Sequence, residues 1–151
     1  MKISVFGLGY VGCVSAACLA NDGHQVVGVD VNPQKVETVG AGRSPIVEPG
    51  LDELVAEGVR SGRLVTTTSA RDAVAASDVS LICVGTPSNG NGSLNLKYVE
   101  NVCREIGDAL RDKHGYHVVV MRSTVLPGTC ALRLIPLIEE YSGRDVGDGF
   151  G

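Results

Sequence analysis

The chain has 151 residues, of which 44% are hydrophobic and 20% charged, and its formal net charge is −4. This length fits one domain that buries a hydrophobic core. Basic and acidic residues are interspersed, so the sequence offers no nucleic-acid surface, and an anionic ligand would have to be held locally by backbone amides and a few side chains. Glycines interrupt the apolar N-terminal stretch, so we predict neither a secretion signal nor a membrane span.

The five cysteines form no CxxC pair, and their number is odd; they are Cys13, Cys18, Cys83, Cys103 and Cys130. This distribution is typical of reduced thiols, and we therefore expect a cytoplasmic protein. None of the five has an evident base beside it, which favours core filling over catalysis. The sequence predicts no metal site.

The first 30 residues carry the strongest functional pattern. A β-branched run, 2–6, is followed by Gly7, Gly9 and Gly12, which open a stretch of apolar residues at helical spacing. A second apolar run then ends in Asp30, 18 positions after the last of these glycines. A strand, a glycine turn, a helix and a strand that ends in an acidic residue together predict a dinucleotide-binding unit.

Each glycine has a physical reason at its position. Gly7 permits the tight turn after the strand, Gly9 lets the backbone approach a pyrophosphate, and Gly12 allows the helix to pack close to the sheet. The unpaired amides at the start of the helix, including those of Tyr10 and Val11, supply hydrogen-bond donors and a partial positive charge. We expect the pyrophosphate of the cofactor here.

Asp30 is expected to accept hydrogen bonds from the ribose hydroxyls of the adenosine. Its charge would repel a 2′-phosphate, and the residues Val31, Asn32 and Pro33 offer no compensating arginine, so NAD is favoured over NADP. Lys35, one turn into the next helix, is either a further ribose contact or a solvated side chain. The structural alternative is that the glycines serve turn geometry alone and Asp30 caps the helix that begins at Pro33.

The rest of the chain alternates helices with strands. The apolar periodicity predicts helices at 33–41, 51–59, 69–76 and 96–110, strands at 63–68, 79–84 and 118–121, and a last helix that ends near residue 141. Pro136 is expected to kink or delay that last helix. The alternation predicts an α/β fold of the Rossmann type: a doubly wound, mostly parallel sheet in three layers, without its last strand.

Polar residues follow the strands at the edge where ligands bind in such sheets. This edge is formed by the carboxyl ends of the strands, beside the first strand. Hydroxyls of Thr86, Ser123 and Thr124 are expected there, near the nicotinamide half of the cofactor. The alternative is that they cap strands or helices, and for Ser123 both interpretations stay open. Glu48, in a proline-rich loop, either folds over the cofactor with that loop or is simply exposed.

Four strings resemble the amino-terminal domain of the UDP-glucose/GDP-mannose dehydrogenase family. They are FGLGYVG at 6–12, SPIVEPGL at 44–51, CVGTP at 83–87 and RSTVLPGT at 122–129, and the resemblance covers the whole chain. It implies that NAD is contacted by Tyr10, Val11, Asp30, Lys35, Thr86 and Thr124.

The segments 83–88, 102–107 and 121–128 resemble the branch that makes GDP-mannuronate, an alginate precursor, more than enzymes that convert UDP-glucose to UDP-glucuronate. By this resemblance, the enzyme oxidises the C6 alcohol of a nucleotide sugar twice, reduces two NAD, and passes through a thiohemiacetal and a thioester on a cysteine.

The resemblance also implies what this chain lacks. The catalytic cysteine, the assisting lysine and asparagine, the helix that builds the family's dimer and the sugar-nucleotide domain are expected after Gly151. Residues 1–142 are therefore predicted to form the NAD-binding domain and 143–151 a truncated connection, with no catalytic residue present and no activity of the chain alone. The assembled enzyme is expected to be a homo-oligomer.

Two other functions use the same N-terminal unit. One is a β-hydroxyacid or hydroxyacyl-CoA dehydrogenase, against which the EPGL and STVLPG strings argue. The other is a nucleotide-binding module without catalysis.

Overall fold

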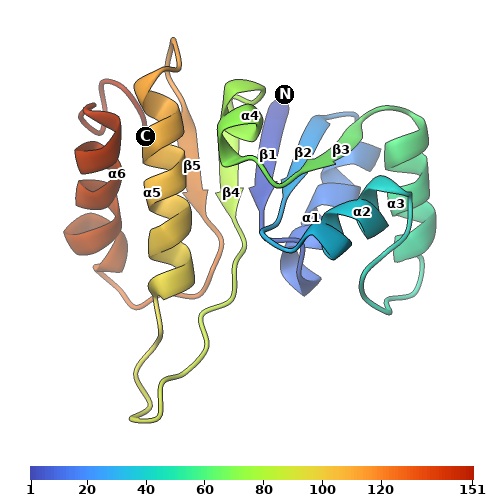
Figure 1. Cartoon of the computed structure of the whole chain (residues 1–151), viewed down its shortest axis with the longest axis horizontal. Helices are drawn as coiled ribbons and strands as arrows, with labels where there is room; N and C mark the ends of the chain where they lie inside the picture. The colour runs from blue at the N-terminus through green and yellow to red at the C-terminus, as the bar shows by residue number, and fades with distance from the viewer.

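A computed structural model describes all 151 residues as a parallel five-stranded sheet with helices on both faces (Figure 1). The strands are β1 (Lys2–Phe6), β2 (Gln25–Val29), β3 (Leu64–Thr67), β4 (Val79–Ile82) and β5 (Val118–Met121). Their order in the sheet is β3-β2-β1-β4-β5, and every neighbouring pair is parallel. The chain changes direction across the sheet between β1 and β4, which is the switch point of a doubly wound fold. The predicted fold class is confirmed.

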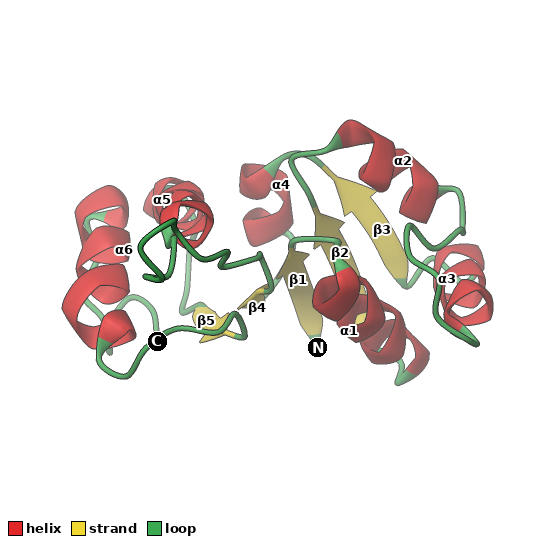
Figure 2. Ribbon diagram, turned by 90° about the horizontal axis from the view of Figure 1, so that it is seen from below, coloured by secondary structure: helices red, strands yellow, loops and turns green.

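Helices cover both faces in three layers. They are α1 (Tyr10–Asn21), α2 (Pro33–Gly40), α3 (Leu51–Arg60), α4 (Ala70–Ala75), α5 (Lys97–Arg111) and α6 (Ile135–Ser142). In Figure 2, α1 lies on one face of the sheet and α4 and α5 lie on the other. None of these helices is both long and apolar enough to span a bilayer.

The sheet separates two hydrophobic cores. One joins β1 to α1, α2 and α3, and its fully buried members include Val5, Ala16, Val39 and Val55. The other lies under α4, α5 and α6. The predicted apolar stripe of α5 faces this second core, because residues three and four positions apart share one face of a helix.

The last helix is irregular at the predicted proline. A π-helical segment, Cys130–Leu134, precedes α6, and Pro136 sits in the first turn of α6. Proline has no backbone N–H and its ring crowds the preceding turn, so the regular α-helical ladder begins only at Ile135. The predicted delay is confirmed.

Residues 143–151 lie against β5. Phe150 is buried and forms a parallel bridge with His117. The Gly151 N–H donates to the His117 carbonyl at 3.0 Å, and the Val119 N–H donates to the Gly151 carbonyl at 2.7 Å. These contacts add a short piece of parallel pairing at the outer edge of β5. The role of this segment as a connection to a further domain stays a prediction.

Buried polar side chains link the amino-terminal halves of β1, β4 and β5. The hydroxyl oxygens of Ser4 and Ser80 lie 2.7 Å apart, the Ser77 hydroxyl donates to Ser4 at 2.9 Å, and Ser80 Oγ lies 2.8 Å from His117 Nε2. Burial and the neighbouring Lys113 ammonium lower the pKa of His117 to about 4. The imidazole is therefore neutral at physiological pH.

Candidate cofactor site

The glycine turn after β1 leaves no room for side chains at two positions. Gly7 has φ +98°, and a Cβ on it would lie 3.0 Å from Val84 Cγ1. A Cβ on Gly12 would lie 1.7 Å from the Gly7 carbonyl oxygen and 3.2 Å from Cys83 Cβ. Gly12 therefore allows α1 to pack mainly against the glycine turn and, less closely, against the residue that follows β4. This geometry refines the predicted reason, which was close packing on the sheet.

Space is open at Gly9, directly before α1. A Cβ on Gly9 would meet no atom within 4 Å. The first paired amide of the helix is that of Cys13, which donates to the Gly9 carbonyl at 2.9 Å, whereas the N–H groups of Tyr10 and Val11 have no acceptor in the protein. Free donors at a helix N-terminus beside a glycine cradle fit a pyrophosphate.

Asp30 ties the glycine turn to the end of β2. Its Oδ2 accepts the Leu8 N–H at 2.8 Å and its Oδ1 accepts the Asn32 N–H at 2.9 Å. The residue is only 8% exposed. The alternative in which Asp30 caps α2 is wrong, because the Gln34 N–H at the start of this helix donates to Asn32 Oδ1. A carboxylate offers about four acceptor positions, so Asp30 keeps capacity for a ribose hydroxyl.

Lys35 joins Asp30 from the first turns of α2. Its ammonium lies 3.3 Å from Asp30 Oδ2, and its side chain is 38% exposed. The sequence left a ribose contact and a solvated side chain equally open. The structure shows the ammonium paired with the buried Asp30 carboxylate, whose charge it partly balances, and a contact of Lys35 with the ribose stays a prediction.

The loop before α3 is fastened to the start of α1. The Tyr10 hydroxyl donates to Glu48 Oε2 at 2.7 Å, and this bond raises the pKa of the Tyr10 phenol. At the base of the loop, the Ser44 N–H donates to Asp52 Oδ1 at 2.7 Å. Glu48 is therefore not a free loop carboxylate. Its bond to Tyr10 holds the loop against the first residue of α1.

The three predicted hydroxyls follow β4 and β5 but have different roles. The Ser123 hydroxyl donates to the carbonyls of Val84 at 2.7 Å and Ile82 at 3.2 Å, so the capping interpretation is correct for Ser123. Thr86 is half-buried, Thr124 is exposed, and neither hydroxyl has a partner in the protein. A contact of these two threonines with the nicotinamide half of the cofactor stays a prediction.

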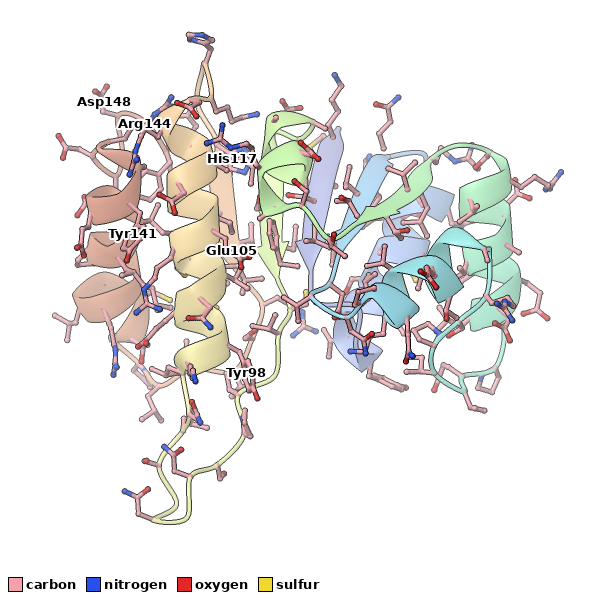
Figure 3. The ribbon with its side chains drawn as sticks, viewed as in Figure 1. Tyr98, Glu105, His117, Tyr141, Arg144 and Asp148 are labelled. Atoms are coloured by element: carbon pink, nitrogen blue, oxygen red, sulfur yellow. The ribbon has the colours of Figure 1, made fainter.

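A cleft of about 60 Å³ lies beside Asp30, between β2, β4 and α5. Its lining consists of Phe6, Gly7, Val29, Asp30, Val31, Val84, Val102 and Glu105. The contribution of α5 was missed by the sequence interpretation. The three-residue spacing of Val102 and Glu105 places both on one face of the helix, and Figure 3 shows Glu105 extending from α5 toward the strands.

All five cysteines are free, and three of them sit where burial raises the thiol pKa. Burial raises the pKa of the Cys13 and Cys83 thiols and raises that of Cys103 to about 12. A thiol with a raised pKa is a poor nucleophile at neutral pH. This end of the sheet can bind and orient an anionic dinucleotide, but these buried thiols are unsuited to covalent chemistry.

Comparison with known proteins gives concordant matches over the chain. The profile of the UDP-glucose/GDP-mannose dehydrogenase family, NAD binding domain, matches residues 1–149. GDP-mannose 6-dehydrogenase of Azotobacter vinelandii is 58% identical over 151 residues, which cover 100% of this chain and 35% of that protein. UDP-glucose 6-dehydrogenase of Rhizobium meliloti is 52% identical over 130 residues, which cover 85% and 29%.

A solved structure shows the same arrangement of elements. The ternary complex of GDP-mannose dehydrogenase from Pseudomonas aeruginosa superposes with a TM-score of 0.99 at 58% identity, and the match covers 100% of this chain and 35% of that one. The chain therefore spans about a third of the length of the relatives that it matches.

Proposed function

Because the chain belongs to the UDP-glucose/GDP-mannose dehydrogenase family and is an NAD binding domain of that family, we propose that it is the cofactor-binding part of a dehydrogenase that oxidises GDP-mannose to GDP-mannuronate. The 58% identity to a GDP-mannose 6-dehydrogenase over the full chain supports this substrate. A UDP-glucose 6-dehydrogenase is the second candidate, and the 52% identity over 130 residues supports it.

The observation that carries the proposal is the phosphate cradle, which consists of Gly7, Gly9 and Gly12 and the free N–H groups of Tyr10 and Val11. The free N–H groups of Tyr10 and Val11 donate to the pyrophosphate, and Gly9 leaves the space in which it lies. Asp30 accepts hydrogen bonds from the adenosine ribose, and the Lys35 ammonium, 3.3 Å from Asp30 Oδ2, donates to the same ribose. The Asp30 carboxylate excludes a 2′-phosphate, so the site takes NAD in preference to NADP.

The hydroxyls of Thr86 and Thr124 orient the nicotinamide half at the ends of β4 and β5. When bound, NAD supplies the acceptor for a hydride from the sugar carbon. The chain holds and aligns this acceptor. The relatives are about three times as long, and we place the nucleophile and the sugar-nucleotide site in their remaining two thirds. A homo-oligomer in the cytoplasm completes the proposal, and the free cysteines suit that reducing compartment.

Titration calorimetry with NAD and NADP tests the site. NAD should bind more tightly than NADP, and Asp30→Ala should weaken NAD binding by about 1.5 to 3 kcal/mol, because it removes charge-assisted hydrogen bonds. Glu37→Ala removes an exposed carboxylate from α2 and is the matched control. Unchanged NAD affinity in Asp30→Ala would refute the assignment.

A second assay separates binding from chemistry. GDP-mannose or UDP-glucose is added with NAD, and NADH absorbance is followed. We expect no turnover by this chain alone, whereas turnover would place a nucleophile within these 151 residues and overturn the proposed division of labour.

A further inference from the structure

One carboxylate of α5 differs from the others by having no partner. Glu100 Oε1 lies 2.6 Å from Arg133 Nε, and Asp108 Oδ1 lies 3.3 Å from Arg111. Glu105 takes part in no ion pair and no hydrogen bond of the protein, although it lines the cleft beside Asp30. Burial raises the pKa of the Glu105 carboxyl. The residue as a whole is exposed, and its carboxylate, without a partner in the protein, can accept a hydrogen bond from a ligand that lies in the cleft.

The rest of the cleft is mainly apolar. Val84 follows β4 and Val102 lies on α5, and both side chains line it. Val31 on the rim is 83% exposed, and a ring bound there would stay partly open to solvent. Asp30 and Glu105 line the same cleft, which therefore combines apolar walls with two carboxylate acceptors.

We propose that Glu105 recognises the base of the dinucleotide by accepting a hydrogen bond from the exocyclic amine at C6 of adenine. This inference rests on the proposed function, in which Asp30 holds the adenosine ribose. The base is joined to that same ribose, so it must lie next to Asp30, and the cleft is the concave surface that Asp30 itself lines. Adenine matches the cleft, because its faces are apolar and its amine donates.

The same geometry discriminates against a C6 carbonyl. An ionised carboxylate can only accept hydrogen bonds, so it satisfies an amine and repels a carbonyl oxygen. Glu105 is therefore a residue that determines base specificity, whereas Asp30 determines the choice between a 2′-hydroxyl and a 2′-phosphate. Two carboxylates on different elements read two different groups of one ligand.

Nicotinamide hypoxanthine dinucleotide, which carries a carbonyl in place of the amine, provides the test. Calorimetric titration of the unaltered protein should show NAD binding several-fold more tightly than this analogue, whose only nearby donor is the N1–H, displaced from the position of the amine. Glu105→Gln should bring the ratio close to one, because an amide can accept from an amine and donate to a carbonyl. Glu105→Ala should also lose the preference. Each ratio is measured within one variant, so a fold defect affects both ligands alike.

Asp108→Asn is the matched control, since it removes the same charge from the same helix outside the cleft. It should leave the ratio unchanged. If both Glu105 variants keep the preference of the unaltered protein, base recognition by Glu105 is wrong. If Asp30→Ala also leaves NAD binding unchanged, the proposed cofactor site fails as well. An Asp30 effect without a Glu105 effect overturns only the present inference.

Discussion

Polar groups at the two ends of the sheet differ in their hydrogen bonding. At the carboxyl ends of the strands, the N–H groups of Tyr10 and Val11 and the Thr124 hydroxyl have no partner in the protein. In the amino-terminal halves, Ser4 and His117 are fully buried and hydrogen-bonded within the protein. Figure 3 shows His117 near the amino-terminal ends of the strands and Glu105 farther along toward their carboxyl ends. The first end keeps free donors for a ligand, whereas the buried hydroxyls of the second end are paired within the protein, although Nδ1 of His117 has no partner there.

The difference follows from the direction of the parallel strands. Each strand runs into a loop at its carboxyl end, and the next helix points its N-terminus, with free amides and partial positive charge, to that same edge. Buried hydroxyls elsewhere must be paired inside the protein, since a desolvated hydroxyl without a partner is destabilising. Substitutions at the two ends should therefore separate binding from stability.

The largest effect is expected from a substitution within the phosphate cradle. In Gly12→Ala, the added methyl would lie 1.7 Å from the Gly7 carbonyl oxygen. We expect the free energy of unfolding to fall by about 3 kcal/mol or more, because backbone must move. Chemical denaturation measures this loss, and NAD binding should be lost with it.

Gly9→Ala is the matched control for that clash. A Cβ at Gly9 meets no atom of the protein within 4 Å, and φ is −81°. Its stability should stay near that of the unaltered protein while its NAD affinity falls. Equal stability losses in the two alanine variants would contradict the cradle.

The second prediction concerns acid stability at the amino-terminal end. The pKa of His117 is about 4 in the folded protein against 6.5 when unperturbed. Below pH 6.5 the unfolded chain binds a proton that the folded protein does not, so stability falls as the pH drops toward 4, by up to about 3 kcal/mol. Denaturation curves across this pH range measure the loss.

His117→Gln removes this titration and keeps a polar side chain for Ser80. The difference in unfolding free energy between the two proteins should therefore depend on pH between 6.5 and 4. Parallel profiles would show that His117 is not the group responsible. NAD affinity at neutral pH should not respond to this substitution.

A pair of hydroxyl deletions sharpens the contrast further. Ser4→Ala removes one hydrogen-bond partner from each of Ser77 and Ser80, which keep the Ala73 carbonyl and His117, and it should cost about 1 kcal/mol of stability with NAD affinity unchanged. Thr124→Val should lower NAD affinity and leave stability unchanged, because Thr124 is exposed and has no partner in the protein. Thermal melts and NAD titrations of both variants test these opposite effects on stability and affinity. A loss of stability in Thr124→Val would contradict the prediction.

The smallest effect concerns the exposed bond between Tyr10 and Glu48. Glu48→Gln replaces the carboxylate whose hydrogen bond and charge raise the pKa of the Tyr10 phenol. The pKa of this phenol should fall toward its ordinary value, as followed by ultraviolet difference titration. Glu53→Gln, an exposed carboxylate in the first turn of α3, is the control and should leave the titration unchanged.

The sequence determined the features that depend on neighbouring residues. Periodicity located the strands and helices, and the spacing of Gly7, Gly9 and Gly12 indicated the cradle, because turn geometry and helix ends are set within a few positions. It could not decide what Asp30 does, since both a ribose contact and a helix cap suited a carboxylate at that position. The structure showed that Asn32, and not Asp30, caps α2.

Tertiary structure alone decided which distant groups meet. The Leu8 amide bonds Asp30 across 22 positions, Tyr10 bonds Glu48 across 38, and Glu105 shares a cleft with Asp30 through a helix on another part of the chain. Strand order and helix packing determine these contacts, and neither can be predicted from a local sequence pattern. The sequence therefore identified the cofactor through its backbone cradle, while the folded chain assembled the side chains around it.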